Sequence, residues 1–152
     1  MSIDQLSFHQ ALADEVNAHP ETFRPLGETD MIAALVMRRP DGDWAVRLCF
    51  EELACAAVDE IDPAEAPRAD YYLDGPIAAW QAMFDDIVAN GGASGRQTIN
   101  SLTLLGTDIR LRGDDPMGTD KFSRFNQTLQ EYLDGAARIA VTAGRVTTEE
   151  PS

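Results

Sequence analysis

The sequence predicts an α+β domain with a five-stranded, mostly antiparallel sheet that is covered on one face by helices. Short apolar runs of strand length gather between residues 31 and 73, and two long amphipathic helices occupy the second half of the chain. Strands grouped apart from helices are typical of this class. The 152 residues suit one domain, which we expect to span residues 1–148 before a mobile tail at 149–152.

The first half predicts one helix and four strands. Residues 2–18 carry an apolar stripe at helical spacing and should cover the sheet. The runs 31–37 and 44–50 flank a turn with Pro and Asp-Gly chemistry, which indicates a hairpin. We expect a third strand at 53–58, after a tight turn, and a fourth at 69–73.

The first amphipathic helix is predicted from Pro76 to Asn90. Pro76 suits a first helical position, with Asp74 or Gly75 as the cap before it. Gly91 allows the last turn to close. The apolar stripe of this helix consists of Ile77, Trp80, Phe84, Ile87 and Val88, with Met83 beside them.

The second amphipathic helix is predicted around residues 120–133 and should end at Gly135. Its stripe consists of Phe122, Phe125, Leu129, Tyr132 and Leu133, and Asn126 interrupts the stripe. Between the two helices we expect a short helix at 97–105 and the fifth strand at 109–112. Residues 136–148 suggest a short edge strand.

Charge excludes some partners. The chain has 26 acidic and 12 basic side chains and a formal net charge of -14. Such a surface repels phosphate backbones and anionic membranes, so we expect no nucleic-acid partner. No apolar run approaches the ~20 residues of a membrane span, and no secretory leader is recognisable, so we expect a cytoplasmic location without membrane insertion.

No pattern of catalytic, cofactor-binding or metal-binding residues is recognisable. The sequence lacks HExxH, CxxC, P-loop and GxGxxG patterns, so we assign no catalytic residue, no metal and no cofactor. His9 and His19 stand ten residues apart, which is no metal spacing, and surface or capping roles are the better interpretation.

The two aromatic stripes form the candidate ligand-binding site. They are most simply core, and they become a ligand wall if a cavity lies between these helices and the sheet. Asn126 needs a partner in an apolar interior, which can be a backbone group, a buried water or a ligand. The candidate ligand-binding residues are Trp80, Met83, Phe84, Phe122, Phe125, Asn126 and Leu129.

Several local phrases resemble the small bacterial proteins of the sterol carrier protein 2 superfamily, over most of the chain. These phrases are Val16-Asn17-Ala18-His19-Pro20-Glu21, then Tyr72-Leu73-Asp74-Gly75-Pro76 with Trp80, and finally Ile109-Arg110-Leu111-Arg112-Gly113-Asp114. The resemblance implies a five-stranded sheet and helices that enclose an apolar tunnel for lipids or other hydrophobic ligands, without covalent catalysis. The acidity of this chain departs from the sterol carriers, as does its lack of a peroxisomal ending.

Three functional hypotheses follow. The first is a carrier or binding domain for a small hydrophobic, lipid- or sterol-like molecule. The second is a small isomerase- or cyclase-type enzyme of similar shape, which would need a buried carboxylate as general base. The third is an interaction module that forms a homodimer or docks a protein partner through an apolar face.

Overall fold

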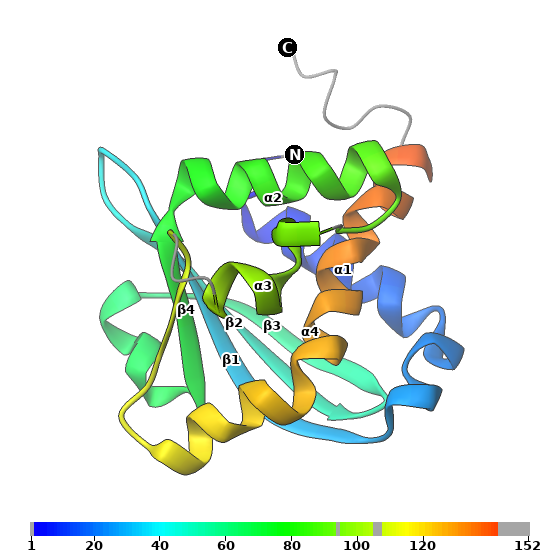
Figure 1. The fold of residues 1–152 in the computed structure, drawn as a ribbon, viewed down its shortest axis with the longest axis horizontal. Helices are drawn as coiled ribbons and strands as arrows, with labels where there is room; N and C mark the ends of the chain where they lie inside the picture. Colours follow the sequence, from blue (N-terminus) through cyan, green and yellow to red (C-terminus); the bar gives the residue numbers. More distant parts are fainter. Residues whose placement is uncertain (1, 94, 105–107, 143–152) are drawn as a thin grey trace.

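The sheet has the predicted five strands. The computed structural model describes residues 2–93, 95–104 and 108–142. The strand order is β3-β2-β1-β4-β5 (Figure 1). Three of the four strand pairs are antiparallel, and β1 runs parallel to β4, so the predicted class is confirmed. The strands are β1 (Thr29–Arg38), β2 (Trp44–Glu52), β3 (Ala54–Ile61), β4 (Tyr71–Pro76) and β5 (Arg110–Arg112).

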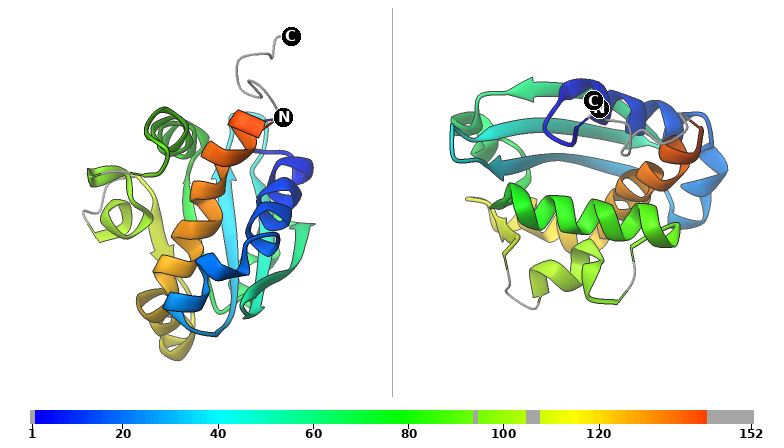
Figure 2. Two further views of the ribbon diagram at one scale, coloured as in Figure 1. Left: turned by 90° about the vertical axis from the view of Figure 1, so that its right-hand side faces the viewer. Right: turned by 90° about the horizontal axis from the view of Figure 1, so that it is seen from above.

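The α-helices lie together on one face of the sheet (Figure 2). The α-helices are α1 (Leu6–Asn17), α2 (Ile77–Asn90), α3 (Ile99–Leu104) and α4 (Pro116–Thr142). Short 3-10 turns are η1 (Pro20–Thr22), η2 (Arg24–Leu26), η3 (Pro63–Arg68) and η4 (Gly95–Gln97). The apolar side chains of α1, α2 and α4 form one core with the inner face of the sheet, while η3 covers part of the outer face.

Alternation along the strands decides which face each side chain occupies. On β1 the inward residues Met31, Ala33, Leu35 and Met37 are all fully buried. The outward residues Ala34 and Val36 are also buried, because Ala66 of η3 packs on them. The middle of β1 is therefore covered on both sides, which explains its continuous apolar sequence.

A side chain forms hydrogen bonds with the free edge of strand β3 near its start. The Asn17 amide nitrogen donates to the Cys55 carbonyl at 3.0 Å, and the Cys55 N–H donates to the Asn17 amide oxygen at 2.8 Å. An unpaired strand edge invites pairing with other chains, and this amide occupies the two backbone groups that a new strand would use. α1 is fixed to the sheet by the same contact.

Several predicted boundaries differ from the structure, among them the start of α2 and the end of α4. Helix α2 begins at Ile77, so Pro76 is its N-cap and Asp74 and Gly75 belong to β4, whereas Gly91 ends it in the left-handed conformation as predicted (φ 78°). The expected stop at Gly135 is wrong, because α4 continues to Thr142. Ala136 and Ala137 are buried beyond that glycine, and this burial offsets the roughly 1 kcal/mol that a helical glycine costs.

Residues 136–142 are consequently helical and not the start of the expected edge strand. Residues 143–148 and the tail at 149–152 lie outside the described part of the chain.

Candidate ligand-binding site

The candidate residues on α2 are buried in the packed core. Trp80 and Met83 have no exposed surface, and Phe84 is only 2% exposed. The Trp80 indole N–H donates to the carbonyl of Val36 at 3.0 Å, so it is satisfied by the sheet. Phe84 meets the ring of Phe8 edge-on, with centroids 5.2 Å apart. These side chains hold α2 against β1 and α1.

The candidate residues on α4 reach nearer to the surface. Leu129 is fully buried, and Phe122 meets the ring of Tyr71 edge-on at 5.4 Å between centroids. Phe125 is only half-buried, and the guanidinium carbon of Arg124 lies 5.0 Å from its ring centroid. Aromatic side chains thus line α4 from the interior to its surface.

Asn126 does not face the apolar interior. Its side chain is half-buried, and its amide nitrogen donates to the backbone carbonyl of Ser123 at 3.1 Å. The expectation of an interior amide is therefore wrong, while the expectation of a backbone partner is confirmed. The local cause is the backbone at Phe125, the preceding residue, which leaves the helical conformation (φ -121°, ψ 15°).

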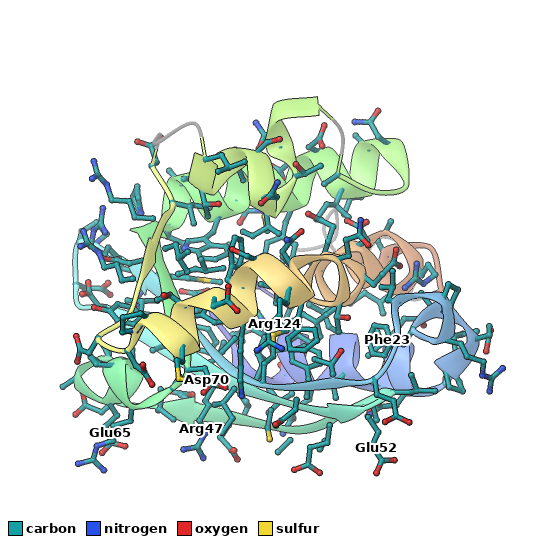
Figure 3. The ribbon with its side chains drawn as sticks, turned by 60° about the horizontal axis from the view of Figure 1, so that its bottom comes forward. Phe23, Arg47, Glu52, Glu65, Asp70 and Arg124 are labelled. Atoms are coloured by element: carbon teal, nitrogen blue, oxygen red, sulfur yellow. The ribbon has the colours of Figure 1, made fainter. Side chains whose placement is uncertain are left out.

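This kink divides α4 into two parts. The first part ends at Arg124 and lies against the start of β4, beside Asp70 (Figure 3). Gly118 approaches the backbone carbonyl of Asp70 so closely that a Cβ on this glycine would collide with it. The Lys121 ammonium lies 3.4 Å from the Asp70 carboxylate and 3.8 Å from that of Asp30. Backbone contact and ion pairs therefore fix this part on β1 and β4.

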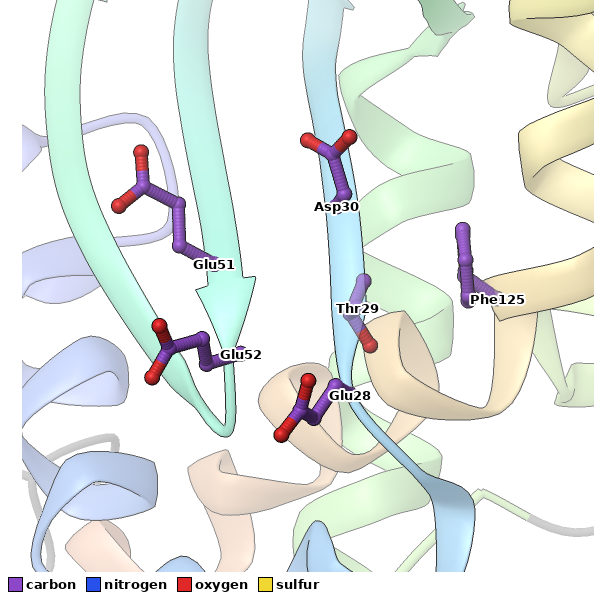
Figure 4. A pocket seen from close by; sticks show the side chains of 6 residues that line it. All are labelled: Glu28, Thr29, Asp30, Glu51, Glu52 and Phe125. Carbon is purple, nitrogen blue, oxygen red and sulfur yellow. The ribbon is translucent and has the colours of Figure 1, made fainter.

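An open pocket of about 470 Å³ lies beside the kink (Figure 4). It combines the aromatic ring on α4 with a hydroxyl and four carboxylates at the start of β1 and the end of β2. The lining residues are Glu28, Thr29, Asp30, Glu51, Glu52 and Phe125. The acidic rim favours neutral or cationic molecules over anions.

Thr29 marks the inner limit of this pocket. Its side chain faces α4, where its hydroxyl lies 3.2 Å from that of Thr128. Thr29 is 4% exposed and Thr128 is 2% exposed, so the pair separates the open pocket from the core. Sequence reasoning missed the two threonines and the four carboxylates, because the pocket joins strand ends and a helix kink that are distant in sequence.

A second open pocket, of about 490 Å³, lies by β5 and the start of α4. It is lined by Tyr72, Leu111, Arg112, Gly113, Asp114 and Thr119. No residue predicted to bind a ligand borders it. The pocket at the kink is the better candidate because Phe125 forms its wall.

The structure also corrects the interpretation of His9. This side chain is fully buried, and Nε2 lies 2.8 Å from the carbonyl oxygen of Ile3. Because a carbonyl only accepts, Nε2 carries the hydrogen, and Nδ1 accepts from the Tyr132 hydroxyl at 2.9 Å. Burial lowers the pKa of His9 to about 4, so the ring is a neutral link between α1 and α4.

The carboxyl groups of α4 whose pKa is raised by burial lie outside the pocket at the kink. Burial raises the pKa of Glu131 and Asp134, and neither residue lines the pocket at the kink. Within the described residues, no group of three or more His, Cys, Asp or Glu side chains is placed to hold a metal ion. Across the same residues, no helix has the length and apolar character needed to cross a membrane.

Comparison with solved structures identifies the fold. A crystal structure of sterol carrier protein 2 superposes with a TM-score of 0.68 at 22% identity, covering 90% of this chain and 98% of that one. The solution structure of a conserved hypothetical protein from Thermus thermophilus, described as a possible sterol carrier protein, gives 0.69 at 20% identity. It covers 91% of this chain and 90% of that one.

The chain therefore has the sterol carrier protein 2 fold, as its sequence phrases indicated. No family model matches the chain, and no curated protein matches its sequence.

Proposed function

We propose that this chain is a binding or carrier domain for a small hydrophobic, lipid- or sterol-like molecule, held between α4 and the sheet without covalent chemistry. The observation that carries the proposal is the pocket at the kink, which is lined by the half-buried ring of Phe125 where that ring packs on the apolar core. The fold supports it, since one of the two similar solved structures is sterol carrier protein 2 and the other is described as a possible sterol carrier protein.

Burial of apolar surface supplies the binding energy in this proposal. At roughly 25 cal/mol per Å², covering about 300 Å² of ligand surface contributes roughly 7.5 kcal/mol before the entropy of association is subtracted. Phe122 and Leu129, buried behind Phe125, extend the apolar wall toward the core. In this proposal Trp80, Met83 and Phe84 belong to the packed core that supports the site and do not contact the ligand.

Replacing Phe125 by aspartate tests the proposal. Phe125→Asp removes the aromatic wall and adds a fifth carboxylate to the acidic pocket, so we expect the affinity for the hydrocarbon probe diphenylhexatriene to fall at least tenfold. Fluorescence titration measures it. The fold should survive because Phe125 is only half-buried.

Met117→Asp is the matched control, since Met117 lies on the same helix and is 78% exposed. This variant should bind the probe as the parent does. If Phe125→Asp remains folded and also binds as the parent does, the site lies elsewhere.

A further inference from the structure

The hydroxyl of Tyr71 is buried with a poor partner. Tyr71 has no exposed surface, and its O–H donates to the thioether of Met31 at 3.2 Å. Among the described residues that thioether is the only acceptor recorded for this hydroxyl, and a thioether is a weak one. A buried hydroxyl that lacks a good acceptor destabilises the fold, because its lost hydration is not replaced.

Tyr132 also has a buried hydroxyl, but this hydroxyl has strong hydrogen-bond acceptors beside it. It is equally buried, yet its oxygen lies 2.9 Å from Nδ1 of His9 and 3.2 Å from the His9 carbonyl. The two tyrosines therefore differ in the hydrogen bonds available to them, although both are inside the same core. The O–H of Tyr71 can therefore exchange the Met31 thioether for a stronger acceptor.

Two contacts link Tyr71 to the pocket at the kink. Its partner Met31 is two residues from Thr29 on the same face of β1, and Thr29 lines the pocket. Its ring contacts Phe122, which precedes Phe125 by one turn of α4. A molecule that enters past Phe125 and parts the Thr29–Thr128 contact therefore approaches the Tyr71 hydroxyl.

We propose that Tyr71 is the polar anchor of the ligand site and donates its hydrogen bond to a carbonyl or hydroxyl oxygen of a neutral amphiphile. This inference rests on the proposed function and names the ligand class for it. Burial raises the pKa of Tyr71, so the phenol remains a donor at neutral pH. An anionic ligand is disfavoured because it would have to pass Glu28, Asp30, Glu51 and Glu52.

Two fluorescent probes distinguish a hydrogen bond from Tyr71 from general apolar binding. Laurdan is a neutral amphiphile with one ketone oxygen, whereas diphenylhexatriene is a hydrocarbon. Tyr71→Phe keeps the ring and its contact with Phe122 but removes the hydroxyl. We expect it to weaken laurdan binding three- to tenfold, which corresponds to a hydrogen bond of ordinary strength, and to change diphenylhexatriene binding less than twofold.

Laurdan emission gives a second readout, independent of affinity. A hydrogen bond to its ketone shifts the emission to longer wavelength, so the bound probe should emit at shorter wavelength in Tyr71→Phe than in the parent. Tyr72→Phe is the matched control, since Tyr72 follows directly on β4 and points to the opposite face of the sheet. It should leave both probes and the emission unchanged.

The outcomes are distinguishable. If Tyr71→Phe binds laurdan with unchanged affinity and emission, or loses both probes equally, the anchor is wrong while the carrier function stands. If the parent protein binds neither probe, the proposed function fails and the anchor fails with it. A competition assay checks the charge argument: octadecanol should displace laurdan at lower concentration than octadecanoate, and the reverse order would contradict a neutral ligand.

Discussion

At the scale of single residues, the side chains that decide the chemistry are the ones whose orientation depends on tertiary contacts. Asn126 was expected in the interior and lies nearer the surface, whereas His9 was expected at the surface and is buried. Asn126 stands in an apolar stripe by sequence, but the kink at Phe125 leaves it half-buried and bonded to Ser123. His9 gives no sequence signal for burial, because its partners Ile3 and Tyr132 meet only in the folded chain.

His9 should make the stability of the fold depend on pH. Its pKa is about 4 in the folded state and 6.5 as the ordinary value, so between these values the unfolded chain binds more protons. The free energy of unfolding should therefore fall as the pH drops from about 6.5 toward 4. Between pH 7 and pH 5 the loss should be about 2 kcal/mol, measured by urea denaturation.

The control for this effect is His9→Gln, which retains a donor but cannot titrate. It should be less stable than the parent at pH 7 and should lack this part of the pH dependence. Other titrating groups, including Glu131 and Asp134, are common to both proteins and cancel in the comparison. Equal pH dependence in the two proteins would show that His9 is not the group responsible.

At the scale of elements, periodicity predicted where helices and strands lie better than where they end. The stripe of α2 and its closing glycine were correct, because a left-handed glycine is a local requirement of the chain. The end of α4 was missed because Gly135 has the same local signal, and only the burial of Ala136 and Ala137 against the core carries the helix onward. The kink at Phe125 had no sequence signal, since no proline or glycine stands there.

Two glycines of α4 should respond in opposite ways to alanine. A Cβ on Gly118 would collide with the backbone carbonyl of Asp70, so the first part of α4 would have to move away from β4. We expect Gly118→Ala to destabilise the protein by about 1 to 3 kcal/mol, measured by chemical denaturation.

Gly135→Ala is the matched substitution in the same helix. Its new Cβ would lie 3.5 Å from side-chain carbons of Leu12 and Glu15, which is ordinary contact. Alanine also suits a helix interior better than glycine, so we expect stabilisation by about 0.5 to 1 kcal/mol. Destabilisation of similar size in both variants would contradict the close docking of the first part of α4.

At the scale of the whole molecule, the fold was predictable and the pocket was not. Grouped strands, two amphipathic helices and a few short phrases indicated a sterol carrier protein 2 fold, and two solved structures of that kind superpose on about nine-tenths of the chain. The pocket brings together the start of β1, the end of β2 and the kink of α4. No local pattern relates residues so far apart in sequence.

The central claim is that this domain carries a small hydrophobic molecule, and native mass spectrometry of the protein purified from its own host tests it most directly. We expect a mass increment close to one ligand per chain, and denaturing analysis should release a neutral, oxygen-bearing lipid-like molecule. A protein that arrives empty and also fails to take up diphenylhexatriene would contradict the carrier function and favour an interaction module.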